Sequence, residues 1–244
     1  MSLIIIFSIL IALTLLLTIH AYINMGFQTG KSEFEYIRQA FLTTAQNIPY
    51  LIRPLAGGGE YLVSLPSVRT GIGWMNYGYI RFYINDTNAI SFNCRSLYSK
   101  IDLAIITTNH TIYGVDTIVV NDTRLLPRLR EYYANGSTYL ELDTCRLAVF
   151  IDKVGELGRV VYYVRIIYVD LEPIIRTNLL GGVNTLKLRI RGTPQIYRYD
   201  NVYGLLITLE HRDGTILSVD PAELGISPPI TITIIRYRVA VEIG

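Results

Sequence analysis

The first 30 residues contain no Asp, Glu, Lys or Arg, and nearly every residue between Leu3 and Ile19 is Leu, Ile, Phe or Ala. An α-helix rises 1.5 Å per residue, so about 20 apolar residues cross the hydrocarbon core of a membrane. Water does not favour such a surface, and lipid or protein has to cover it. The sequence therefore predicts an N-terminal helix of the transmembrane type.

A cleaved secretory signal peptide is the alternative interpretation of this segment. Signal peptides carry a basic stretch, a short apolar core and a cleavage site of the small-x-small type. Here the first positive charge is Lys31, and Ala21 is preceded two positions earlier by Ile19, which is not small. We therefore expect the helix to be retained.

An apolar side chain recurs every seven positions between residues 27 and 48. This spacing is typical of a helical stripe, so we expect the helix to continue and to pack this face on the protein's own head. Pro49 is expected to end the helix at or just before it, which gives one rod of about 45 residues. The predicted helix-to-head contacts are Phe27, Phe34, Ile37, Phe41 and Ile48.

After residue 53 the sequence is typical of β-strands. Residues 230–243 alternate with period two, which predicts a strand with one buried face. We also predict a hairpin across residues 85–88, a strand pair formed by 101–107 and 111–120, and one short helix within 124–133. The predicted fold class is α+β: an N-terminal helix over residues 1–52 and an all-β, sandwich-like head over 53–244. A candidate internal boundary lies near 171–184.

The cysteines and the N-x-S/T sequons indicate an extracellular setting. Cys94 and Cys145 are expected to form a disulfide, with two unrelated buried thiols as the alternative. Four sequons predict N-linked glycans on a solvent-facing region, although asparagines are also common in ordinary turns. The candidate glycosylation sites are Asn85, Asn109, Asn121 and Asn135.

No arrangement of residues points to catalysis. The three histidines are far apart in the sequence, and no nucleophile elbow, phosphate-binding loop or zinc-protease motif is present. A net charge of +2 without a polybasic run gives no reason to expect nucleic acid as a partner. We expect no enzyme activity, no cofactor and no metal. A secreted enzyme or carbohydrate-binding domain with an uncut signal is disfavoured for the same reason.

The charge-free helix, its amphipathic continuation and the all-β head together resemble type IV pilin-like subunits, particularly those of archaeal surface filaments. Bacterial members of this family carry Glu at the fifth mature position, where this chain has Ile5. Archaeal members usually lack that acid, so the resemblance is to the archaeal branch. The basic residue and Gly that precede a prepilin cleavage site are absent, so Met1 is either a mature N-terminus or an unprocessed start.

The resemblance implies a structural subunit of an extracellular helical filament, a homo-oligomer whose helix lies in the membrane before assembly. Adhesion is expected rather than motility, because the N-terminal stretch shared by motor-driven swimming filaments is not found. The alternative is a monomeric cell-surface β domain that is tethered by one transmembrane helix and binds a ligand or coat protein. The expected filament-core residues are Leu3, Ile6, Leu10, Leu13, Leu16 and Leu17.

Overall fold

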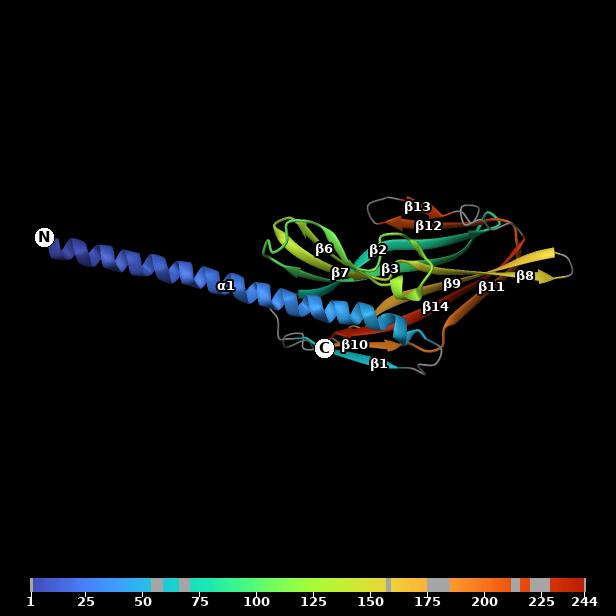
Figure 1. Cartoon of the computed structure of the whole chain (residues 1–244), viewed down its shortest axis with the longest axis horizontal. Helices are drawn as coiled ribbons and strands as arrows, with labels where there is room; N and C mark the ends of the chain where they lie inside the picture. Colours follow the sequence, from blue (N-terminus) through green and yellow to red (C-terminus); the bar gives the residue numbers. More distant parts are fainter. Residues whose placement is uncertain are drawn as a thin grey trace.

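The computed structural model describes residues 2–53, 59–65, 71–156, 159–174, 185–211, 216–219 and 229–243. Within these ranges one long N-terminal helix is followed by a mostly β head built from two curled sheets (Figure 1). The predicted fold class is confirmed.

Helix α1 spans Ser2–Leu51, 50 residues, and is about 75 Å long by the rise of an α-helix. The predicted end at or before Pro49 is wrong, because Pro49 lies inside the last turn. A proline in an interior turn removes one backbone hydrogen bond. Leu51 and Ile52 are buried in the head, and this packing keeps the final turn in place.

The strands form two sheets that are mostly antiparallel. In sheet A the order is β1 (Glu60–Ser64), β10 (Thr185–Ile190), β14 (Ile230–Ile243), β9 (Arg159–Ile174), β8 (Leu147–Glu156) and β5 (Val119–Val120), with β11 (Gln195–Val202) also paired to β14. In sheet B the order is β13 (Ile216–Val219), β12 (Leu205–His211), β2 (Gly71–Ile84), β3 (Thr87–Ile101), β7 (Ser137–Asp143), β6 (Arg128–Ala134) and β4 (His110–Tyr113). β14 runs parallel to β9 over most of its length.

Two apolar cores fill the described part of the head. The sheet core lies among strands of both sheets and includes Ile80, Phe82, Phe92, Ile166, Ile207 and Ile232. The helix core joins α1 to both sheets and includes Phe34, Ile37, Phe41, Leu129, Leu140, Leu188 and Val239.

The long strands change the face that they bury partway along their length. On β14, Ile232 and Ile234 belong to the sheet core, whereas Val239 and Val241 belong to the helix core. Successive side chains point to opposite faces of a strand, so the two cores lie on opposite faces of β14. The expected single buried face of residues 230–243 is therefore wrong. β3 and β9 change their buried face in the same way.

The hairpin predicted across residues 85–88 is confirmed. β2 and β3 pair on either side of Asn85 and Asp86, whose φ angles are 48° and 64°. Asn and Asp tolerate this left-handed conformation better than most residues, which suits a two-residue hairpin turn.

Two local predictions are wrong. Segments 101–107 and 111–120 do not pair with each other, because Ile101 ends β3, while β4 pairs with β6 and β5 with β8. The expected helix within 124–133 is only a short 3₁₀ turn, η1 (Thr123–Leu125), followed by β6. Every residue of β6 pairs with β7, and this backbone pairing outweighs the local helix propensity of the sequence.

The candidate boundary near 171–184 falls partly within β9, and residues 175–184 lie outside the described part. Strands from both sides of this stretch share both sheets: β12 and β13 join sheet B, whereas β10, β11 and β14 join sheet A. The described strands therefore form no separate C-terminal unit.

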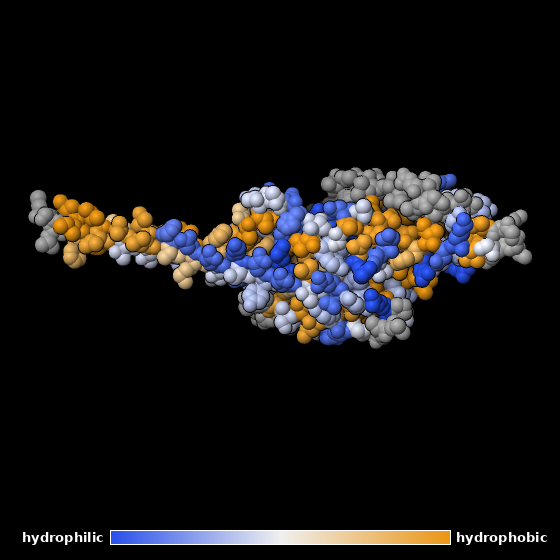
Figure 2. Space-filling view, viewed as in Figure 1, coloured by the Kyte–Doolittle hydropathy of each residue, from blue (hydrophilic) through white to orange (hydrophobic). Residues whose placement is uncertain are grey.

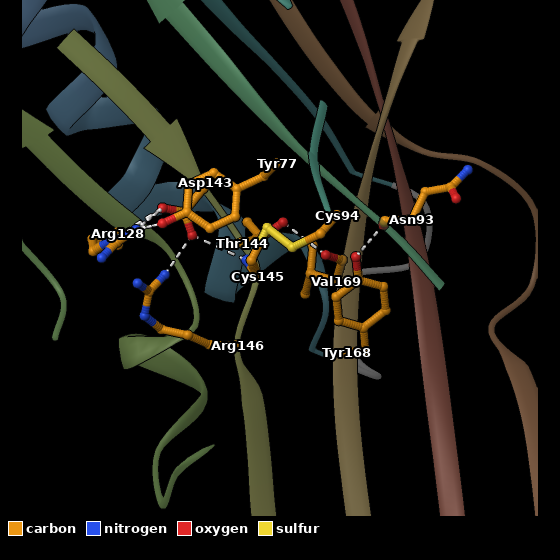
Figure 3. The surroundings of a disulfide bond; sticks show 10 residues. All are labelled: Tyr77, Asn93, Cys94, Arg128, Asp143, Thr144, Cys145, Arg146, Tyr168 and Val169. Atoms are coloured by element: carbon orange, nitrogen blue, oxygen red, sulfur yellow. Dashed lines mark hydrogen bonds and ion pairs between the residues drawn. A yellow bond between two sulfur atoms is a disulfide. The ribbon is translucent and has the colours of Figure 1, made fainter. Parts of the chain in front are cut away.

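The chain crosses from sheet B to sheet A between β7 and β8, at residues 144–146 (Figure 3). Cys145 forms the predicted disulfide with Cys94 of β3, with Cα atoms 5.5 Å apart. Thr144 Oγ1 donates to the backbone oxygen of Val169 at 2.7 Å, which ties the crossing to β9. Covalent and polar bonds thus hold the two sheets together at one point.

A buried carboxylate organises the same crossing. Asp143 accepts hydrogen bonds from Arg128 Nε at 2.9 Å and from Arg146 Nη1 at 2.5 Å, and all three side chains are at most 8% exposed. Burial raises the pKa of Asp143, but the charges of Arg146 and Arg128 outweigh burial and hold this pKa below its ordinary value. We name Asp143, its two arginines and the Cys94–Cys145 disulfide the crossover clamp.

Replacing Asp143 with Asn is expected to lower the free energy of unfolding of the head by about 3–5 kcal/mol, because two buried arginines lose their carboxylate. Asp86→Asn makes the same chemical change at an exposed turn and should have little effect. The measurement is thermal unfolding of the full chain in detergent, followed by circular dichroism. Equal stability of the two variants would contradict the clamp.

The difference in stability between wild type and Asp143→Asn is expected to depend on pH. The pKa of Asp143 is lowered in the folded state, so the stability it contributes is complete above the unfolded pKa and is lost as pH falls through the folded one. The difference between wild type and Asp143→Asn should therefore narrow below about pH 4. A difference that widens with acid would contradict this sign.

Candidate functional site: the protruding helix

The first half of α1 extends away from the head, as Figures 1 and 2 show. Every residue from Ile4 to Thr29 is exposed, and we name this range the protruding segment. Its large apolar side chains lie between 41% exposed at Phe27 and 80% exposed at Tyr22. Apolar side chains occupy all sides of the helix, so a partner on one side alone would leave much of this surface uncovered.

The hydroxyl side chains within the apolar run need no outside partner. Ser8, Thr14 and Thr18 each donate to the backbone oxygen four residues earlier, at 2.7–2.9 Å. A hydroxyl bonded in this way to its own helix can enter an apolar environment without an unsatisfied donor. The apolar run that contains these three hydroxyls can thus be buried without leaving a hydroxyl donor unpaired.

The five expected filament-core residues that the structure describes all lie on the protruding segment and are 55–68% exposed. The side chain of Leu3 lies outside the described residues. Packing on other copies of the chain stays a prediction for the whole set. The five described residues are Ile6, Leu10, Leu13, Leu16 and Leu17.

The second half of α1 is seated between the two sheets. Phe34, Ile37, Phe41 and Ile48 are at most 2% exposed and belong to the helix core. α1 contacts β1 of sheet A and β3, β4, β6 and β7 of sheet B, so both sheets hold it. Phe27 was expected in the same set, and this prediction is wrong, because Phe27 is 41% exposed and precedes Gly30, the first buried residue along the described part of α1.

Gly30 is the first buried residue along the described part of α1. A side chain at this position would collide with Leu103, so the absence of a Cβ atom allows the close approach. Gly26, one turn away, has nothing within 4 Å of where its Cβ would be. The two glycines of the G-x-x-x-G sequence thus have different surroundings: Gly30 lies against Leu103 of the head, and Gly26 faces open space at the edge of the same hollow.

The hollow beside these glycines is lined by both helix and head residues, among them Lys100 and Asp102. Lys100 Nζ lies 2.7 Å from Asp102 Oδ1. The hydrogen bond from Lys100, with another from Ser137, lowers the pKa of Asp102, so a carboxylate and an ammonium face solvent together at the helix exit.

A buried carboxylate also links the helix to sheet B. Glu131 of β6 is 3% exposed, and its Oε1 accepts from Arg38 Nε of α1 at 2.5 Å. His110 Nε2 of β4 lies 3.2 Å from the other oxygen of Glu131. This link combines residues from three elements, and the sequence analysis did not identify it.

The four sequon asparagines are all exposed. Asn85 and Asn109 use their side-chain oxygens to accept backbone N–H groups, from Tyr203 at 2.9 Å and from Tyr133 at 2.9 Å. These bonds leave the amide nitrogen, the atom that carries an N-linked glycan, outside the interaction. Asn135 lies in the β6–β7 turn with φ of 51°. The positions suit modification, and glycosylation stays a prediction.

Among the described residues, no group of three or more His, Cys, Asp or Glu side chains could hold a metal ion. Comparisons with protein-family models, with curated proteins and with solved structures found no match. The function must therefore be inferred from the geometry of the protruding helix and its seat.

The packing of the second half of α1 between the two sheets can be tested with two aromatic residues on opposite faces of the helix. Phe41→Ala is expected to lower the free energy of unfolding by about 3–5 kcal/mol, because a fully buried ring leaves a cavity. Tyr36→Ala removes a ring that is 65% exposed and should cost much less. Chemical unfolding of the full chain in detergent measures both. Equal losses would contradict the proposed seat.

Proposed function

We propose that this chain is a structural subunit of an extracellular filament of the archaeal type IV pilin-like kind. The protruding segments would bundle in the filament core, and the β heads would form the outer surface. One observation carries the proposal: a single unbroken helix is seated in the head by its second half and exposes an apolar surface on all sides of its first half.

The energetics favour a partner that surrounds the segment. Burying even half of its apolar surface is worth on the order of tens of kcal/mol, gross, against water. A neighbouring copy offers the same charge-free helix, so several copies packed side by side can cover one another on every side. Released subunits should therefore aggregate unless detergent or lipid shields the helix.

A membrane can hold the segment before assembly. The protruding segment is about 39 Å long by helical rise, and the hydrocarbon core is about 30 Å thick. α1 is long and apolar enough to cross a bilayer. Transfer from lipid to like helices exchanges one apolar environment for another, so assembly need not expose the segment to water.

The rigidity of the rod supports a polymer. α1 continues without a break from the protruding segment into the seat, where the helix core and the Arg38–Glu131 bond hold it. A fixed angle between helix and head lets identical contacts repeat along a filament.

The alternative is a monomeric surface domain tethered by α1. One span-length helix is enough for this function. The apolar stripe of residues 34–48 does not distinguish the two proposals, because the protein's own head already covers it. Only a rigid junction, which a tether does not require, favours the filament.

The proposed role of the filament is adhesion. The heads would lie on its surface, where their exposed sequons could carry N-linked glycans.

Leu13→Arg is expected to abolish fibres while the head stays folded, because a charge has no partner among apolar helices. Leu206→Arg places the same charge at an exposed leucine of the head, on β12, and should leave fibres intact. Negative-stain electron microscopy after detergent removal, with circular dichroism of each variant, makes the comparison. Normal fibres from Leu13→Arg would contradict the proposed packing of Leu13 in the filament core.

A further inference from the structure

We propose that His20 and Asn24 form a hydrogen-bonding site that sets the axial register between neighbouring copies of this chain. The inference rests on the proposed filament and adds which side chains align its subunits. Both residues are exposed and lie one helical turn apart in the protruding segment, with Asn24 Nδ2 3.0 Å from His20 Nε2.

This pair differs from the other polar side chains of the apolar run. The hydroxyls of Ser8, Thr14 and Thr18 are satisfied by their own helix, and burial leaves them with no unpaired donor hydrogen. His20 and Asn24 satisfy each other only in part. Among the described residues 4–24, the pair and the exposed hydroxyl of Tyr22 therefore hold the hydrogen-bonding capacity that is still open to a neighbour.

The chemistry of the pair defines what it can bind. An amide nitrogen only donates, so His20 Nε2 is the acceptor, and the neutral ring carries its hydrogen on Nδ1. The pair then has one free donor, His20 Nδ1–H, one free acceptor, Asn24 Oδ1, and a second amide hydrogen. A matching donor and acceptor are what a second copy of the same pair provides.

The described part of the head does not reach these side chains. His20 lies ten residues before Gly30, the first buried residue along the described part of α1, or about 15 Å along the helix. Most side chains around the pair are apolar; the polar ones are Tyr22, between the two residues, and Gln28, one turn after Asn24. His20 Nδ1–H lies two turns from Gln28, and inside a bundle neighbouring copies bring acceptors close to it.

Self-complementarity fixes an offset. Parallel copies at the same height would pair the two Asn24 amides but would place His20 Nδ1–H opposite the same donor, which leaves both ring donors without an acceptor. Because His20 and Asn24 are four residues apart, copies that bond through them are shifted by about 6 Å along the axis. A single polar position in an otherwise apolar helix interface is known to select register in this way.

Electron cryomicroscopy with helical reconstruction tests the site in fibres of the full chain. In wild-type fibres, His20 of one copy is expected within about 3.2 Å of Asn24 of a neighbour, a normal hydrogen-bond distance. The double variant His20→Leu with Asn24→Leu should lose the single wild-type symmetry, as fibres of mixed rise and twist or as unordered aggregates. Thr18→Val removes a self-satisfied hydroxyl without changing shape, and its fibres should keep the wild-type symmetry.

Three results would overturn the inference. The double variant could keep the wild-type rise and twist, which leaves the filament proposal standing. The wild-type reconstruction could place the pair against water or lipid headgroups, which also leaves the filament standing. Wild-type chains that form no fibres at all would instead remove the filament proposal, and the register site with it.

Discussion

The packing of α1 between the two sheets is the interaction on which the rest of the structure depends. Phe34, Ile37 and Phe41 are buried against strands of both sheets, so the helix completes the head's second core rather than lying on its surface. The same helix then leaves the head at Gly30 and continues as a single rod. The head therefore holds the apolar protruding segment in one direction, in a position where the described residues of the protein do not cover it.

The β architecture follows from this arrangement. Long strands such as β14 bury one face in the sheet core and the opposite face in the helix core, which requires the two sheets to stay aligned at their junction. The crossover clamp lies at the point where the chain passes from one sheet to the other, and it combines a disulfide with a buried ion pair. A buried ion pair contributes little net stability but is costly to break, so it favours one arrangement of the crossing over others.

Local patterns in the sequence predicted some features and missed those that depend on distant contacts. The charge-free composition and the seven-residue spacing were enough to predict the helix, and the Asn85-Asp86 turn was enough to predict the hairpin of β2 and β3. Spacing alone could not show where the head begins, so Phe27 was misplaced. β6 mixes Leu and Arg in its sequence. Its strand conformation depends on pairing with β7 and on contacts of its Glu131 with Arg38 and His110, which lie elsewhere in the sequence. The change of buried face along β14 is likewise invisible to a period-two pattern.

The central claim is that other copies of this chain cover the protruding segment. A photoreactive amino acid at position 13, activated in assembled material from the cell surface, would report directly what lies against it. Mass spectrometry of the cross-linked peptides should then find position 13 joined to residues 3–19 of a second copy. Adducts with lipid alone, in material that contains the intact chain, would contradict the claim.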